Sequence, residues 1–175
     1  MVYGAEPGVG MHAELAERAE KAGLGGKYKI LACGAEPDSL IPGLAKGGLL
    51  DEKKTLGDGV FDEIVCIRVL CGVPQVQETV DVLYKCLKPG GRLVVCEHVV
   101  NNGEGGGNVV GWFLQYLYMA LGWSFFMGGC RLRRDTTALL MKAAEADGGW
   151  AEVQLERVDE WSTIPHIVGY CAKSA

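Results

Sequence analysis

Apolar residues form three short, nearly continuous runs, which predict β-strands at residues 28–33, 61–70 and 92–100. Strict alternation of apolar and polar positions is missing from all three. Continuous Val, Ile, Leu and Cys of this length is typical of strands covered on both faces, as in a parallel sheet flanked by helices. The pattern therefore predicts a sheet with helices on both sides.

Helical periodicity lies between these runs. Apolar or small residues recur at helical spacing over 11–22, where a glycine run ends the pattern, and an apolar stripe follows Pro74 over 75–87. A weaker helical pattern covers 39–50. Because strand and helix alternate, we expect an α/β fold of the Rossmann-like, doubly wound type. In such sheets, ligands bind beyond the carboxyl ends of the strands.

The segment 101–108 is rich in Gly and Asn, and we expect it to be a flexible linker. Beyond it, the pattern predicts a helix over 135–146 with Asp135 as its N-cap. Two further strands follow at 151–158 and 166–172. Because the connection between them is short, we expect an antiparallel hairpin. The sheet should therefore be mostly parallel, with an antiparallel closing pair.

Residues 109–130 carry no charge and many aromatic side chains, and two interpretations stay open. Length alone would allow a membrane span, since about 20 apolar residues suffice. However, Gln115, Ser124, several glycines and two tyrosines lower the hydropathy, and the domain continues beyond the segment. These features favour an aromatic helix on the substrate side, with contact between residues 109–129 and a membrane surface as the alternative.

The amino-acid composition excludes several classes of function. The chain has 175 residues, 49% of them hydrophobic and 22% charged, which suits one globular domain with a real core. Its formal net charge of −5 argues against a nucleic-acid partner, which would need a dense cationic face. The 7 cysteines show no C-x-x-C spacing, so we expect reduced packing residues and a cytoplasmic location.

Metal and hydrolase chemistry find no support in the sequence. His12, His98 and His166 lie far apart along the chain without ligand spacing, and the cysteines form no spaced pair, so we expect no metal site. The nucleophile-elbow pattern G-x-S-x-G and the phosphate-loop pattern G-x-x-x-x-G-K-[ST] are both absent.

Candidate binding residues follow the first two strands. Glu6 ends the first apolar stretch, where a carboxylate can accept hydrogen bonds from both hydroxyls of a ribose; an exposed loop acid is the alternative. The turn at 33–36 contains Gly34, Ala35 and Glu36, and its small residues would let the backbone approach a flat base. A plain connection between strand and helix would have the same composition.

The next two strands also end in candidate side chains. Arg68 stands in an apolar run, where an unpaired guanidinium would be costly, so we expect it to face a cleft or a partner carboxylate. A purely structural ion pair is equally open. Glu97 and His98 end the run at 92–100. His98 is a candidate general base, although a lone histidine is more often a hydrogen-bonded structural residue.

An ordered series of motifs follows the chain: VYGAEP at 2–7, VFDEIV at 60–65, LCGV at 70–73, LKPGG at 87–91, CEHV at 96–99, Trp112, GCRL at 129–132 and PHIVGY at 165–170. The series resembles the later motifs of class I S-adenosylmethionine-dependent methyltransferases, and the resemblance covers nearly the whole chain. Within that superfamily, it is most similar to the methyltransferase-like thiol S-methyltransferases and their fungal relatives.

The resemblance implies S-adenosylmethionine as the cofactor and assigns two sets of residues. Those contacting the cofactor would be Glu6 at the ribose, Gly34, Ala35 and Glu36 at the adenine, and Arg68 and Val69 near the methionine end. Those on the substrate side would be Trp112, Arg131 and His166. The terminal hairpin matches the one that separates this fold from dehydrogenase sheets.

The resemblance also implies a single domain over residues 1–175, with a cofactor-side half at 1–100 and substrate-side helices and hairpin at 109–175. Family members begin with a strand and a G-x-G-x-G loop that the series above lacks. We therefore expect an incomplete, amino-terminally truncated domain. Loss of that central strand would leave two half-sheets with unpaired edges and weaken cofactor binding.

Three functions are weighed on these grounds. The leading expectation is methyl transfer to a small-molecule thiol, hydroxyl or amine, which depends mainly on positioning donor and acceptor. The alternative is an inactive truncated remnant that binds a partner through its aromatic segment. A nicotinamide-dependent oxidoreductase is disfavoured, because G-x-G-x-x-G is absent and the terminal hairpin fits it poorly.

Overall fold

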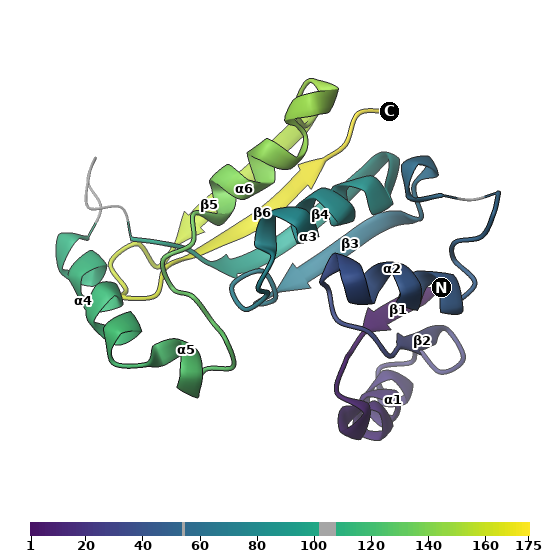
Figure 1. Ribbon diagram of the computed structural model, residues 1–175, viewed down its shortest axis with the longest axis horizontal. Coiled ribbons are helices and arrows are strands. Elements are labelled where there is room, and N and C mark those ends of the chain that lie inside the picture. Colours follow the sequence, from purple (N-terminus) through teal and green to yellow (C-terminus); the bar gives the residue numbers. More distant parts are fainter. Residues whose placement is uncertain (54, 102–107) are drawn as a thin grey trace. The chain divides into compact units, whose positions relative to one another are not determined.

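The strands of this chain form two separate sheets in the computed structural model, which describes residues 1–53, 55–101 and 108–175 (Figure 1). The chain divides into two compact units, Met1–Thr55 and Leu56–Ala175. Two sheets match the number expected from the sequence, whereas the truncation from which that expectation came stays a prediction. The predicted linker at 101–108 lies largely outside the described residues, and the division of the domain at that segment stays a prediction.

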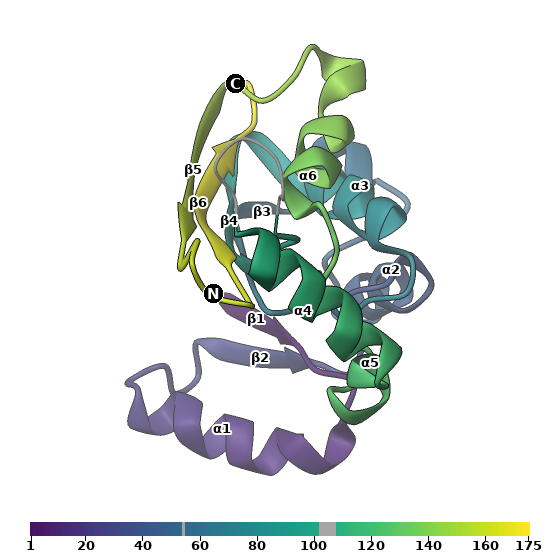
Figure 2. The ribbon, with the colours of Figure 1, turned by 90° about the vertical axis from the view of Figure 1, so that its left-hand side faces the viewer.

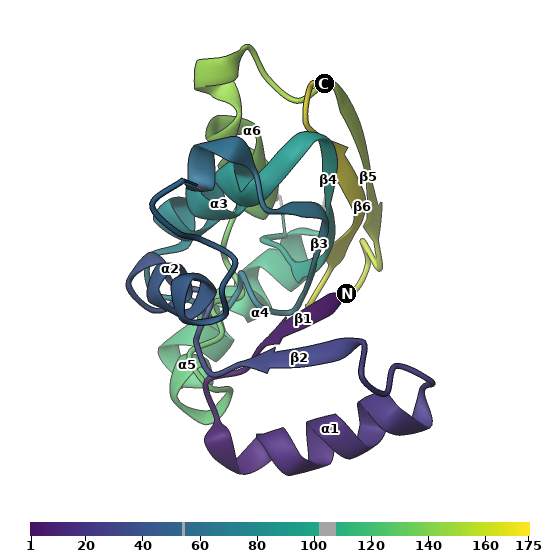
Figure 3. The same ribbon diagram turned by 90° about the vertical axis from the view of Figure 1, so that its right-hand side faces the viewer.

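The first unit pairs two parallel strands through a helix. Strands β1 (Val2–Ala5) and β2 (Tyr28–Leu31) are joined by the short 3-10 helix η1 (Val9–Met11) and helix α1 (His12–Lys21). Helix α2 (Pro37–Lys46) follows β2, and α1 and α2 lie on opposite sides of the strand pair (Figures 2 and 3). Parallel pairing places the carboxyl ends of both strands at one edge.

The second unit is a four-stranded sheet of order β3-β4-β6-β5. Strands β3 (Phe61–Ile67) and β4 (Leu87–His98) are parallel and are joined by helix α3 (Val76–Cys86). Strand β6 (His166–Ala172) runs antiparallel beside β4, and β5 (Glu152–Val158) pairs antiparallel with β6. The predicted antiparallel hairpin is confirmed, and with it the mostly parallel α/β architecture.

The remaining helices of this unit are η2 (Leu56–Asp58), α4 (Val109–Ala120), α5 (Trp123–Phe126), α6 (Thr136–Ala143) and η3 (Glu145–Asp147). Helices α3 and α6 lie over the same face of the sheet (Figures 2 and 3). Asp135 is the N-cap of α6, as predicted: its carboxylate accepts the N–H of Ala138 at 3.0 Å.

The expectation that all three apolar strands are covered on both faces is wrong for β3. The side chains of Val65 and Ile67 are 55% and 60% exposed. Along β4, Leu93, Val95 and Glu97 are buried, and the residues between them are more exposed. Buried and more exposed residues therefore alternate along β4, as expected for a sheet with one covered face. Strand β3 is an edge strand, and within the described residues it pairs with β4.

The uncharged segment after residue 108 folds as two helices instead of one. Gly122, with φ 90°, lies between α4 and α5, a conformation that favours glycine. Gln115 is fully buried and fixes α4 to the end of β4, because it accepts the N–H of Asn101 at 2.8 Å and donates to the carbonyl of Val99 at 3.1 Å. Among the described helices, none combines the length and apolarity needed to cross a membrane. Contact with a membrane surface stays a prediction.

Candidate functional site

Glu6 stands at the carboxyl edge of the β1–β2 pair. The register aligns Ala5 with Leu31, and the N–H of Glu6 donates to the carbonyl of Leu31 at 3.0 Å. One carboxylate oxygen of Glu6 accepts the N–H of Gly8 at 2.7 Å, and His12 Nε2 donates to the Glu6 carbonyl at 2.8 Å. The acid is therefore held at the strand end, where the sequence predicts a ribose-binding carboxylate.

The predicted base-binding turn lies at the same edge, after β2. Gly34 donates its N–H to the hydroxyl of Ser39 at 2.8 Å. A Cβ on Gly34 would lie 2.2 Å from a carboxylate oxygen at the flexible end of Glu36, whose side chain folds over the turn. A carboxylate on one strand and a small-residue turn on its neighbour fit a ribose with its attached base. Ala35 belongs to the same turn.

In the second unit, a buried carboxylate holds the loop that follows β3. Glu97 is 0% exposed, and one of its oxygens accepts the N–H groups of Val69 at 2.7 Å and Leu70 at 3.0 Å. Its other oxygen accepts the N–H of Cys71 at 3.2 Å. Three consecutive donors of one loop are thus satisfied by one side chain.

A buried arginine binds backbone carbonyl groups of the same loop. Arg134 donates to the carbonyls of Leu70 and Val73. Burial raises the pKa of Glu97, while the backbone N–H groups and the charge of Arg134 act in the opposite direction. Burial lowers the pKa of Arg134, as does neighbouring Arg131. The loop geometry is therefore set by two buried ionisable side chains from outside it.

Of the two expectations for Arg68, the partner carboxylate is not met, and the expectation that it faces a cleft stays a prediction. It lies just beyond β3, is exposed, and has φ 56°, a left-handed conformation uncommon for residues other than glycine. It forms no ion pair within the described part of the chain, and because it is exposed, the desolvation cost that predicted a partner does not arise. Strained backbone of this kind often occurs at functional sites.

His98 lies at the end of β4 against two other side chains. Its Nδ1 is 3.4 Å from the Sγ of Cys130, and its ring packs edge-on against His166, with 4.6 Å between ring centroids. The Sγ of Cys71 completes a cluster in which all three ligating atoms lie within 4.8 Å of one another. The fold therefore joins residues that are distant along the chain, which their spacing in the sequence did not indicate. The expectation that the chain has no metal site stays a prediction.

The ionisation of this cluster favours neutral forms. Burial lowers the pKa of His98, and the charges of His166 and Arg68 lower it further. Burial raises the pKa of Cys71 to about 12, and neighbouring Cys130 and Glu97 add to the effect. A neutral imidazole therefore lies beside the protonated thiol of Cys71 near neutral pH.

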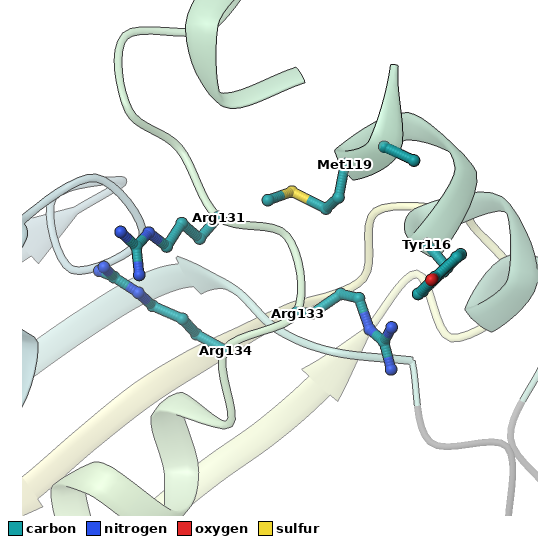
Figure 4. A pocket seen from close by; sticks show the side chains of 6 residues that line it. Tyr116, Met119, Arg131, Arg133 and Arg134 are labelled. Carbon is teal, nitrogen blue, oxygen red and sulfur yellow. The ribbon is translucent and has the colours of Figure 1, made fainter. Parts of the chain in front are cut away.

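A cavity of about 430 Å³ lies beside α4 (Figure 4). Its lining consists of Tyr116, Met119, Ala120, Arg131, Arg133 and Arg134. Arg133 extends toward Tyr116, with 5.4 Å from its guanidinium carbon to the ring centroid, and Arg131 and Arg134 extend to the other side. The guanidinium carbon of Arg133 also lies 5.0 Å from the ring centroid of Trp112. The cavity therefore combines aromatic and apolar surface with positive charge.

The three predicted substrate-side residues fall in two places. Arg131 lines the cavity, and Trp112 adjoins it through Arg133. His166 lies instead with His98. The sequence analysis missed the roles of Glu97 and Arg134. A carboxylate inside an apolar strand is a usable signal for Glu97, whereas nothing in the local pattern marks Arg134 among its neighbouring arginines.

Sequence comparisons find a matching family and similar proteins. A profile described as "Methyltransferase domain" matches residues 45–95. The thiol S-methyltransferase TMT1B of Rattus norvegicus is 32% identical over 127 residues, which cover 70% of this chain and 48% of that protein. The chain thus spans about half the length of the curated relatives that it matches.

Solved structures share the fold across almost the whole chain. A possible exported protein from Bordetella parapertussis has a TM-score of 0.65 at 16% identity, with 100% of this chain and 54% of that chain covered. A geranyl diphosphate methyltransferase, solved in complex with SAM, has a TM-score of 0.61 at 10% identity, with 98% and 68% covered. At these identities the likeness shows the Rossmann-like fold alone.

Proposed function

Because this chain belongs to the class I S-adenosylmethionine-dependent methyltransferases, whose cofactor is S-adenosylmethionine, we propose that it serves methyl transfer to a small-molecule thiol, hydroxyl or amine. The observation that carries the proposal is the placement of Glu6 and the turn at Gly34 to Glu36 on neighbouring strands, at one edge of the β1–β2 pair. A thiol acceptor is favoured by the names of the relatives that are about 30% identical.

The residues of this chain bind and orient the reactants in this proposal. The carboxylate of Glu6 accepts hydrogen bonds from the ribose hydroxyls, and the turn after β2 borders the adenine. The family resemblance assigns Arg68 and Val69 to the methionine end. In the second unit, Glu97 fixes their loop by accepting the backbone N–H groups of Val69 and Leu70. When bound, S-adenosylmethionine supplies an electrophilic methyl group on a positively charged sulfur. The catalytic contribution of the chain is then positioning of the acceptor.

The acceptor site is assigned to the cavity beside α4 in this proposal. Tyr116 and Met119 provide aromatic and apolar contact, and Arg131 and Arg133 provide positive charge. Such a lining suits a small molecule that combines an apolar body with a carboxylate or another anionic group.

Binding of S-adenosylhomocysteine tests the cofactor assignment. We expect it to shift the backbone amide resonances of Glu6 and of residues 34–36 in two-dimensional nitrogen-15 NMR spectra. The Glu6→Ala variant should bind about 10- to 100-fold more weakly, because hydrogen bonds to a charged group contribute about 1.5–3 kcal/mol. Glu17→Ala is the matched control, since Glu17 forms an exposed ion pair with Lys21 on α1. It should bind like the wild-type chain.

Two results would contradict the cofactor assignment. One is a wild-type spectrum that S-adenosylhomocysteine leaves unchanged at saturating concentration. The other is equal affinity in the wild-type chain and in Glu6→Ala.

The acceptor assignment predicts a charge-dependent effect at Arg131. We expect Arg131→Ala to weaken binding of a carboxylate-bearing thiol such as mercaptoacetate by about fivefold, since an exposed ion pair is worth up to about 1 kcal/mol. Binding of uncharged 2-mercaptoethanol should stay the same. Tryptophan fluorescence can follow both ligands, because Trp112 adjoins the cavity lining. An equal loss for both thiols would argue against charge recognition by Arg131.

A further inference from the structure

The geometry points to a metal site in the second unit, and we propose that Cys71, His98 and Cys130 bind one zinc ion. The two Sγ atoms and the Nδ1 of His98 lie within 4.8 Å of one another. In tetrahedral zinc sites, bonds of about 2.3 Å to sulfur and 2.0–2.1 Å to nitrogen separate neighbouring ligand atoms by about 3.5–3.8 Å. The 3.4 Å between His98 Nδ1 and Cys130 Sγ is slightly shorter than that separation.

Each ligand comes from a different segment that backbone hydrogen bonds hold in place. Cys71 donates its N–H to Glu97 and accepts the N–H of Arg131 on its carbonyl at 2.8 Å. His98 ends β4, where it pairs in register with His166. The carbonyl of Cys130 accepts the hydroxyl of Ser124 at 2.8 Å. The ligands therefore approach one point from rigid surroundings, as a metal site requires.

The donor set selects the class of metal. Two thiolates and one imidazole suit zinc, whereas magnesium and calcium prefer oxygen ligands. Three protein ligands leave the fourth tetrahedral position for a water or another small ligand, the pattern found in catalytic zinc sites. Cys71 and Cys130 also belong to an apolar cluster with Leu132, against which Tyr118, Met119, Trp123 and Ile164 pack. An apolar shell of this kind limits access of solvent to the ion.

His166 packs beside the proposed ligands without being one of them. Its ring packs against His98, and its Nδ1 lies 4.0 Å from a carboxylate oxygen of Asp159. Its Nε2 is buried and has no hydrogen-bond partner among the described residues. Buried nitrogens without a hydrogen-bond partner are rare in folded proteins.

Charged groups around the cluster set how binding depends on pH. Those that act on it are Glu97, Arg134, Arg68 and His166. Zinc binds cysteine as the thiolate, so its uptake by Cys71 and Cys130 releases protons, and binding should strengthen as pH rises. In this proposal, His98 binds zinc and is not the general base that the sequence analysis considered.

Metal titration of the reduced chain tests the proposal. After treatment with a chelator, the protein should take up one equivalent of zinc. Cobalt in its place should give the thiolate charge-transfer and visible bands of a tetrahedral site. Cys71→Ser, Cys130→Ser and His98→Ala should each bind at least about 100-fold more weakly, because loss of a ligand exceeds the 10- to 100-fold effect of an outer-shell partner. Cys96→Ser is the matched control, since Cys96 also lies on β4 but outside the cluster.

Thermal unfolding separates loss of the ligand from loss of the fold. Zinc should raise the midpoint of the wild-type chain and of Cys96→Ser, and should leave the midpoints of the three ligand variants unchanged. Binding that the ligand variants retain would overturn the proposal. The proposal would also be overturned if Cys71 and Cys130 formed a disulfide on oxidation and the reduced protein took up no metal. Both readouts are independent of methyl transfer, so failure here leaves the proposed function untouched.

Discussion

Replacement of Glu97 with alanine is expected to lower the free energy of unfolding by about 3–5 kcal/mol, the loss typical of breaking a buried charged interaction. The variant leaves the N–H groups of Val69, Leu70 and Cys71 without their acceptor. It also leaves buried Arg134 without the nearby negative charge. Urea unfolding followed by circular dichroism measures the change. Glu63→Ala is the control, because the exposed pair of Glu63 with Arg92 is worth at most about 1 kcal/mol.

The pH dependence of stability provides a second readout for Glu97. Its pKa is raised in the folded state, mainly by burial, so the unfolded chain loses this proton first as pH rises. Stability from this group is therefore fully present below the unfolded pKa of about 4.3 and is lost as pH rises through the folded pKa. Glu97→Gln, which does not titrate, should lack that component. A stability profile that is parallel in both proteins would contradict the assigned pKa direction.

Gly169→Ala is expected to cost about 3 kcal/mol or more, since steric overlap adds to backbone strain of about 1–3 kcal/mol. Gly169 has φ 145°, and a Cβ there would lie 1.9 Å from the carbonyl oxygen of Gln154. Relief by movement is blocked, because Gly169 pairs with Val95 on one side and Leu155 on the other. The change would therefore distort the ladder at the centre of the sheet.

Gly148→Ala separates steric overlap from backbone conformation. Gly148 also has a positive φ, 84°, but no heavy atom lies within 4 Å of a Cβ built there. We expect a cost of about 1–2 kcal/mol, that of a left-handed conformation alone. Urea unfolding of both variants gives the comparison. Equal losses would show that the contact with Gln154 adds nothing.

Local sequence patterns predicted most of the elements because the information they need is local. Helical periodicity placed α1 and α3 within a few residues, and the short connection before His166 predicted the antiparallel hairpin. Asp135 was identified as a cap because its carboxylate bonds to an N–H only three residues away. The carboxyl-edge rule placed Glu6 and Gly34 together, because parallel pairing follows from the strand-helix-strand order.

Predictions that depended on surroundings were less accurate. Arg68 looked buried inside an apolar run, but the strand ends one residue before it and the side chain is exposed. Val65 and Ile67 looked like core, but they occupy the uncovered face of an edge strand. A run of apolar residues indicates which side chains avoid water, but it does not indicate which part of the chain covers them.

The amino-acid sequence by itself determined the α/β class, the succession of helices and strands, and the family, since all three follow from short-range spacing and ordered motifs. Tertiary structure alone decided that Glu97 and Arg134 hold one loop from two sides, and that Cys71, His98 and Cys130 meet. These contacts join residues about 26 to 64 positions apart. No local periodicity encodes such pairs, because they arise when the strands align and their ends converge.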